Sequence, residues 1–175
     1  MADASGVSVL ISAEDIAARV QGLAREIAAL PRKPDIAMPI LVGGFVFAAD
    51  LVRALAREGV NLDIEMLWLR SYGDKRVASA ISMIAGPSEQ IAGRHVLVID
   101  GVLDAGRTIA KAVSLIQAAG AASVQVAVML DKQRRDAVAR ADYIGFTLGD
   151  EFVIGYGMDD AGRHRGLPYI GKVTS

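Results

Sequence analysis

The chain has 175 residues, of which 53% are hydrophobic and 22% are charged, and its formal net charge is −1. This length suits one domain with a full core, and the composition argues against intrinsic disorder. The balanced charge argues against nucleic acid as a partner, and the lack of cysteine excludes disulfides, thiolate metal sites and a cysteine nucleophile. No apolar run reaches membrane-spanning length and the N-terminus does not resemble a signal peptide. We therefore expect a soluble, cytoplasmic protein that does not bind membranes.

Apolar periodicity predicts alternating helices and strands along the chain. The expected helices cover residues 12–30, 45–59 and 109–119, and Ser12 with Asp15 forms a capping-box pattern at the start of the first. The expected strands cover residues 38–42, 64–69, 80–84, 96–100, 123–130, 143–148, 151–156 and 169–173. Strands that alternate with helices favour right-handed crossovers. We therefore predict a single α/β domain with a mostly parallel, doubly wound sheet flanked by helices.

Polar or glycine-rich turns follow four of the expected strands. They lie at residues 42–44, 71–73, 100–108 and 131–132. In parallel α/β sheets, ligands bind beyond the carboxyl ends of the strands. We therefore expect the binding site at the edge of the sheet where these four turns meet.

The stretch HVLVIDGVLDAGRT, residues 95–108, is the most informative of the four turns. An apolar strand ends in Asp100, a second carboxylate follows at Asp104, and Gly106 and Thr108 precede a helix. Backbone N–H groups at a helix N-terminus can hold a phosphate, while carboxylates can face sugar hydroxyls or a metal. The spacing alone fits equally well an ordinary strand–helix turn in which Asp104 caps the helix.

Residues 95–108 resemble the phosphoribosyl-pyrophosphate (PRPP) signature of type I phosphoribosyltransferases. The segments 131–135, 144–159 and 165–173 are similar to those of bacterial hypoxanthine phosphoribosyltransferases. The resemblance runs from about Ile11 to Val173. It implies the type I phosphoribosyltransferase fold, with one domain over residues 1–175, a core over about 35–148 and a small hood from about 1–12 and 149–175.

The resemblance also implies an activity. A purine salvage transferase of this family joins a 6-oxopurine to PRPP, giving the nucleoside monophosphate and pyrophosphate, and it depends on Mg²⁺. Hypoxanthine is the first candidate base and guanine the second. The family generally forms homodimers or homotetramers.

The family's roles carry over to individual positions of this chain. Asp104 would be the general base near purine N7, and Asp100 would face the ribose hydroxyls. Lys132 would donate to the oxygen at purine C6, and Asp159 would bind Mg²⁺. The other implied residues are the phosphate loop (Ala105, Gly106, Arg107, Thr108), pyrophosphate contacts (Gly43, Gly44, Arg165), purine contacts (Phe152, Val153) and the start of a mobile lid loop (Ser71, Tyr72). Taken singly, most of these would fit ordinary core or surface positions.

Three departures from the family pattern concern the sugar and pyrophosphate side. Gly101 stands where a second acid is usual, and Val42 replaces the usual Lys or Arg of the pyrophosphate loop. The loop after Tyr72, up to about Ser79, is short. These departures leave a second hypothesis open, in which the chain is a catalytically weak PRPP- or nucleotide-binding regulatory protein.

Overall fold

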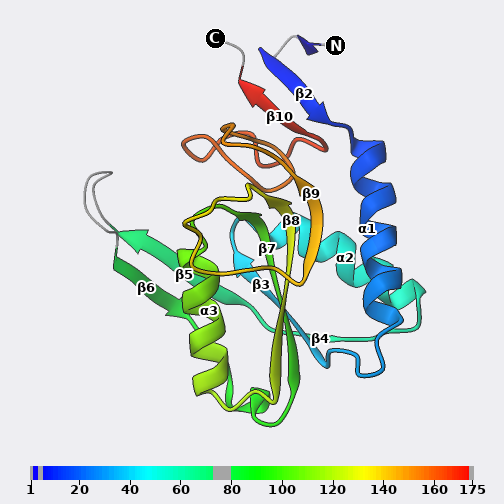
Figure 1. Cartoon of the computed structure of the whole chain (residues 1–175), viewed down its shortest axis with the longest axis vertical. Coiled ribbons are helices and arrows are strands. Elements are labelled where there is room, and N and C mark those ends of the chain that lie inside the picture. Colours follow the sequence, from blue (N-terminus) through cyan, green and yellow to red (C-terminus); the bar gives the residue numbers. More distant parts are fainter. Residues whose placement is uncertain (1, 4–5, 73–79, 174–175) are drawn as a thin grey trace.

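The computed structural model describes residues 2–3, 6–72 and 80–173. Within them, seven strands form a central sheet in which β6, β5, β3, β7, β8 and β9 are neighbours in that order and β4 pairs with β3 (Figure 1). All pairs are parallel except β5 with β6. The strands are β3 (Ile36–Leu41), β4 (Asp63–Ile64), β5 (Leu67–Tyr72), β6 (Ala80–Ala85), β7 (His95–Leu103), β8 (Ser123–Asp131) and β9 (Tyr143–Thr147). The predicted fold class, a mostly parallel α/β sheet, is confirmed.

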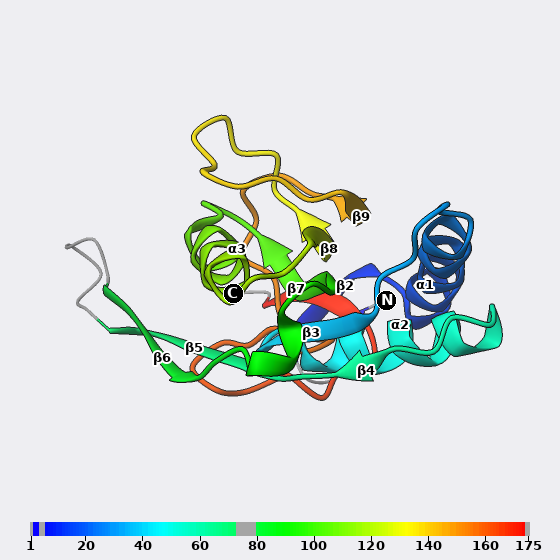
Figure 2. The same cartoon turned by 90° about the horizontal axis from the view of Figure 1, so that it is seen from below.

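Helices cover both faces of the sheet, as the view from below shows (Figure 2). α1 (Ala13–Ala28) and α2 (Phe45–Arg57) pack together on one face, and α3 (Arg107–Ala118) packs on the other. A short 3₁₀ turn, η1 (Glu89–Ile91), precedes β7. The predicted capping box of α1 is present, because the Asp15 N–H donates to Ser12 Oγ at 3.0 Å and Ser12 Oγ donates to the Asp15 carboxylate at 2.7 Å.

The central strands are buried on both faces because their apolar residues alternate between two cores. In β7, Leu97 and Ile99 face the core beneath α1 and α2, whereas Val96 and Val98 face the core beneath α3. All four side chains are at most 1% exposed. The sheet therefore holds the carboxyl end of β7, with its two aspartates, on a rigid base.

The two ends of the described chain meet in a small antiparallel sheet of β1 (Ala2–Asp3), β2 (Val7–Ile11) and β10 (Ile170–Val173). Figure 1 shows it beyond the carboxyl ends of β7 and β8. This pairing is consistent with the expected hood, although the division at residues 12 and 149 stays a prediction. None of the helices described is both long and apolar enough to cross a bilayer.

The strand predicted over residues 151–156 is wrong. Ile154 and Gly155 make only isolated bridges there, to Gly171 and Met158. Tyr156 has a φ of 48° and Gly155 a φ of 91°, and left-handed backbone cannot continue a strand. The apolar run therefore folds as a turn that packs under the small sheet.

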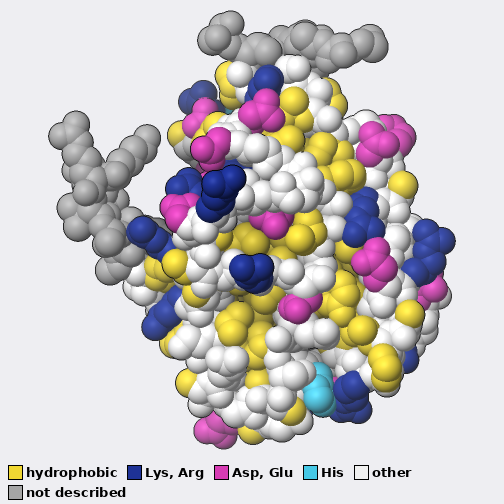
Figure 3. Space-filling view, in the orientation of Figure 1, with side chains coloured by type: hydrophobic (Ala, Val, Ile, Leu, Met, Phe, Trp, Pro, Cys, Tyr) yellow, Lys and Arg dark blue, Asp and Glu magenta, His cyan; other side chains and the backbone are white. Residues whose placement is uncertain are grey.

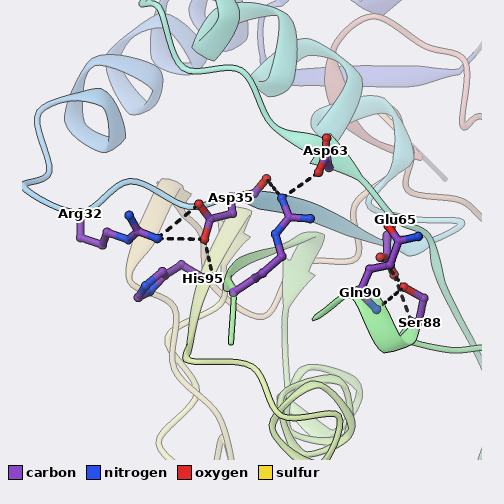
Figure 4. Close-up of polar contacts among 8 residues, drawn as sticks. Arg32, Asp35, Asp63, Glu65, Ser88, Gln90 and His95 are labelled. Carbon is purple, nitrogen blue, oxygen red and sulfur yellow. Dashed lines mark hydrogen bonds and ion pairs between the residues drawn. The ribbon is translucent and has the colours of Figure 1, made fainter. Parts of the chain in front are cut away.

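The amino ends of β3 and β7 are joined by Asp35 (Figure 4). The Asp35 carboxylate accepts a hydrogen bond from the His95 N–H at 2.9 Å and lies 3.3 Å from the Arg32 guanidinium group. The Asp35 carbonyl accepts a hydrogen bond from Arg94, and Arg94 also forms an ion pair with Asp63 at 2.7 Å. The hydrogen bond from His95 lowers the pKa of Asp35. These contacts fix the register of the two strands at the edge opposite the expected site.

Candidate active site

A cleft of about 480 Å³ opens at the carboxyl end of β7, where the chain turns into α3. Six residues that the resemblance assigned to PRPP line it: Asp100, Asp104, Ala105, Gly106, Arg107 and Thr108. Ile81, Val102, Ile109 and Arg134 complete the lining. On the face that carries α3, basic and acidic side chains lie among apolar ones (Figure 3).

The backbone at Gly106 shapes the predicted phosphate loop. Gly106 is the N-cap residue of α3 with a φ of 74°, and a Cβ there would lie 2.8 Å from the Ala139 nitrogen, so only glycine fits. No side chain caps the helix. The alternative in which Asp104 caps α3 is therefore wrong, and the first-turn N–H groups of α3 can meet an anion.

Asp104 lies between two cations on the rim of the cleft. Lys132 Nζ is 3.3 Å from Oδ2, and Arg134 Nη1 is 3.3 Å from Oδ1. The Lys132 side chain is 11% exposed, whereas Asp104 is 44% exposed. The Lys132 N–H also donates to the Leu103 carbonyl at 3.0 Å, which holds the lysine beside β7. A carboxylate and an ammonium group in contact can both face the edge of one planar ligand.

Asp100 contributes a partly buried carboxyl group to the floor of the cleft. Burial raises its pKa to about 7, and the hydrogen bond from the Gly101 N–H at 2.7 Å opposes that shift. Near neutral pH the protonated and the ionised forms of the group are therefore both populated. In its ionised form it is an acceptor for hydroxyl groups in the cleft.

The turn after β3 packs directly against the Asp100–Gly101 backbone. The Gly44 N–H donates to the Ile40 carbonyl at 3.0 Å, so it is not offered to a ligand, and a Cβ on Gly44 would lie 2.6 Å from the Ile99 oxygen. The Gly43 oxygen would lie 2.9 Å from a Cβ on Gly101 and 2.5 Å from one on Gly157. Three backbone segments therefore meet here only because glycines allow the close approach.

Arg165 and Asp159 form an ion pair on the far side of Gly157. Arg165 Nη2 lies 2.6 Å from Asp159 Oδ1, and Nη1 donates to the Gly157 carbonyl at 2.6 Å. The other oxygen of Asp159 accepts the Gly162 N–H at 2.7 Å. Arg165 lines a separate cavity with Tyr156 and Leu167, and the packing of Gly157 on Gly43 links this region to the Asp100–Gly101 backbone.

Phe152 is 60% exposed, although its neighbour Val153 is buried. The segment before it is tied to the end of β8 by the Leu148 N–H, which donates to the Asp131 carbonyl at 2.9 Å. An exposed aromatic ring is a candidate stacking surface for a flat ligand.

The hairpin of β5 and β6 projects from the body of the protein (Figures 1 and 2). Ser71 and Tyr72, the predicted start of the lid loop, are the last residues of β5. The rest of the predicted lid, residues 73–79, lies outside the described residues.

Sequence reasoning missed Arg134 and Gly157. Arg134 belongs to the segment DKQRR, which carried part of the family resemblance but had no role for the arginine. The sequence signal for Arg134 was its position two residues after Lys132. Nothing in the sequence showed that Gly157 would cover the Gly43 carbonyl.

Comparisons with known proteins agree with this geometry. The sequence model of the phosphoribosyl transferase domain family matches residues 9–161 of this chain. The hypoxanthine phosphoribosyltransferase of Haemophilus influenzae is 35% identical over 96% of this chain and 96% of its own length. The bifunctional protein TilS/HprT of Listeria innocua is 36% identical over 93% of this chain, which spans 25% of that longer protein.

A solved structure is similar over almost the whole chain. It is the hypoxanthine phosphoribosyltransferase of Trypanosoma cruzi in complex with the product IMP, with a TM-score of 0.87 and 29% identity. The match covers 99% of this chain and 97% of that one. The chain therefore belongs to the phosphoribosyl transferase family, among the relatives of the hypoxanthine phosphoribosyltransferases, as its sequence motifs indicated.

Proposed function

We propose that the protein transfers the phosphoribosyl group of PRPP to a 6-oxopurine, hypoxanthine first and guanine second, in purine salvage. The contact of Asp104 with Lys132 beside the phosphate loop carries this proposal, because it joins the two groups that a 6-oxopurine needs. A lysine ammonium group has only hydrogen-bond donors, so it accepts a 6-oxo group and leaves a 6-amino group unpaired. The regulatory alternative is not favoured, because relatives that match nearly the whole chain are named as transferases.

In the proposed reaction, the bond from ribose C1′ to the pyrophosphate oxygen breaks and a bond from C1′ to purine N9 forms. The proton on N7 moves to the Asp104 carboxylate, and pyrophosphate leaves with the electron pair of the broken bond. Asp100 would hold the ribose hydroxyls, and the first turn of α3 with Thr108 would hold the 5′-phosphate. Phe152 would stack on the base, and Val153 would read its edge through backbone groups.

On the pyrophosphate side, we propose contacts from the Gly43 N–H and from Arg165. The guanidinium group of Arg165 already lies beside Gly157, which covers Gly43. It can absorb the charge that develops on the leaving pyrophosphate. Gly44 would act by shape rather than by donating a hydrogen bond, since its N–H is engaged with Ile40.

We further propose that Asp159 contributes to binding the Mg²⁺ that this reaction uses. Among the residues that the structure describes, no three or more acidic, His or Cys side chains are grouped to hold a metal. Mg²⁺ at phosphate-transfer sites is usually held by one or two carboxylates with substrate oxygens. The Asp159 oxygens already have Arg165 and the Gly162 N–H as partners, and each oxygen keeps a further lone pair for the ion. When bound, the ion neutralises charge on the pyrophosphate.

We also propose that copies of the chain associate as homodimers or homotetramers. Beside α2, a groove of about 260 Å³ is lined mainly by apolar residues, and it includes Phe45, Ile64 and Met66, which are 49%, 53% and 42% exposed. Large apolar side chains that gather on a surface are typical of association sites. Light scattering on the purified protein, compared with a Phe45→Asp variant, measures this state directly.

The deciding assay mixes the purified protein with PRPP, Mg²⁺ and one base at a time, and measures nucleotide formation. Hypoxanthine, guanine and xanthine test the 6-oxo requirement, and adenine is the control base. We expect turnover with hypoxanthine and none above background with adenine. Tight binding of IMP without turnover would refute the enzyme and support the regulatory alternative.

A further inference from the structure

Arg134 lies on the rim of the cleft, and the proposed reaction gives it no role. Its guanidinium group reaches in two directions. Nε and Nη2 each lie 3.0 Å from an oxygen of Asp136, and Nη1 lies 3.3 Å from Asp104 Oδ1. Its side chain is 37% exposed, and it belongs to the lining of the cleft.

The fork between Arg134 and Asp136, whose side chain is 70% exposed, favours one orientation of the guanidinium group through two hydrogen bonds. Two parallel hydrogen bonds between a guanidinium and a carboxylate specify geometry as well as attraction. The pairing with Arg134 lowers the pKa of Asp136 and raises that of Arg134, so the ion pair is present at neutral pH. Asp150, 4.0 Å from Nη1, is 85% exposed and competes only weakly.

The backbone holds the Arg134 loop against the phosphate loop. The Lys132 N–H donates to Leu103 and the Val138 N–H donates to Ala105, each at 3.0 Å. Between them, Gln133 has a φ of 50° and its N–H donates to the Asp131 carboxylate at 2.7 Å, which turns the chain back toward β7. The position of Arg134 beside Asp104 is therefore set on both sides by backbone contacts.

The two cations beside Asp104 would behave differently when a purine binds. In the proposed reaction, the Lys132 ammonium group is shared with the 6-oxo group of the purine, and Oδ2 of Asp104 lies on that same side. Arg134 is bound to Asp136 and to Oδ1, so it can keep its contact throughout. One oxygen of the carboxylate would then be held while the other faces the proton on N7.

We propose that Arg134 is a positioning residue that orients Asp104 for proton transfer, an inference that rests on the proposed function. It would act through Asp104 and touch neither substrate. Loss of a charge-assisted hydrogen bond of this kind lowers a rate roughly tenfold to a hundredfold. The loss falls on kcat, because the contact with Asp104 matters most when the proton moves.

The test is a double-mutant cycle of Arg134→Gln and Asp104→Asn on hypoxanthine turnover. Arg134→Gln should lower kcat roughly tenfold to a hundredfold and leave the KM for PRPP within about twofold of the wild type. In the Asp104→Asn background, the same change should have little further effect, since its target is gone. Asp136→Asn, which removes the charge that holds Arg134, should reproduce part of the loss. Arg135→Gln is the control for net charge and should match the wild type.

Turnover of hypoxanthine by the wild type would uphold the proposed function. Three results for the variants would then overturn the inference about Arg134. They are unchanged kcat and KM for Arg134→Gln, a raised KM for PRPP with unchanged kcat, and additive effects of the two substitutions on kcat. A raised KM would mean that Arg134 binds a phosphate group directly. The affinity of the same four proteins for IMP, measured by calorimetry, gives the coupling between Arg134 and Asp104 without the need for turnover. Since Asp104 would also face N7 of the product, additive changes in IMP affinity would overturn the inference even if the wild type were inactive.

Discussion

The carbonyl oxygen of Gly43 occupies the space that a side chain on Gly101 would need, 2.9 Å from the ideal Cβ position. Two departures from the family pattern are therefore linked in space, because Gly43 directly follows Val42. Gly101, at the position where the family pattern has an acid, allows close backbone packing between β7 and the turn after β3.

This packing predicts that Gly101→Asp will not raise activity, although the sequence alone suggests restoring the missing acid. The Cβ must displace backbone rather than a flexible side chain, and overpacking of this kind costs about 1–3 kcal/mol. We expect a lower Tm and weaker PRPP binding, measured by thermal unfolding and calorimetry. Gly101→Ala, which adds the Cβ without the charge, should reproduce the loss of stability. Tighter PRPP binding by the Asp variant would contradict the packing argument.

Asp104→Asn should reduce hypoxanthine turnover by about a hundredfold or more, the usual contribution of a general base. The Asp104 side chain is 44% exposed, and the amide keeps its shape, so the Tm should change little. Steady-state kinetics with a melting curve on the same sample separates the two effects. Wild-type turnover would remove Asp104 from the reaction.

Asp100→Asn should stabilise the unliganded protein more at pH 8 than at pH 5. Since the pKa of Asp100 is raised to about 7, the folded chain keeps a proton between pH 4 and 7 that the unfolded chain loses. The contribution of Asp100 to the free energy of unfolding therefore falls as pH rises through that interval. Asparagine does not titrate, so the variant does not lose this stability. We expect a gain on the order of 1–3 kcal/mol at pH 8, after allowance for partial exposure to the cleft.

The same variant should bind PRPP more weakly, because the ionised carboxylate is the better acceptor for ribose hydroxyls. Urea unfolding at both pH values, with calorimetry for PRPP, tests the trade between stability and binding. An equal change in stability at pH 5 and pH 8 would show that Asp100 titrates normally.

Phe152→Ala should raise the KM for hypoxanthine about tenfold, since stacking of a base on an aromatic ring contributes about 1–3 kcal/mol. The ring is 60% exposed, so its removal should not lower the Tm. Phe152→Tyr keeps the aromatic face and is the matched control. An unchanged KM for the alanine variant would exclude stacking.

The regular elements could be predicted from the sequence because their signals are local. Alternation in β7 and the Ser12–Asp15 pattern before α1 each depend on neighbouring residues. The stretch 151–156 has the same apolar pattern as a strand, but its left-handed residues depend on contacts with distant segments. For the site, the spacing predicted a phosphate-binding turn at residues 100–108 and the family resemblance predicted a role for Lys132. The Arg134 contact and the Gly43–Gly101 packing join segments about 30 and 60 residues apart, so only the fold reveals them.

The contacts around Asp35 lie at the amino ends of β3 and β7 (Figure 4), whereas the cleft lies at the carboxyl end of β7. The contacts that set the strand register and the residues of the cleft therefore lie at opposite edges of one sheet. A substitution at the cleft edge can alter substrate use while the strand register survives. This separation makes the carboxyl edge of the sheet evolvable where a side chain is exposed, as at Val42, whereas the packing of Gly101 against Gly43 ties that position to the fold.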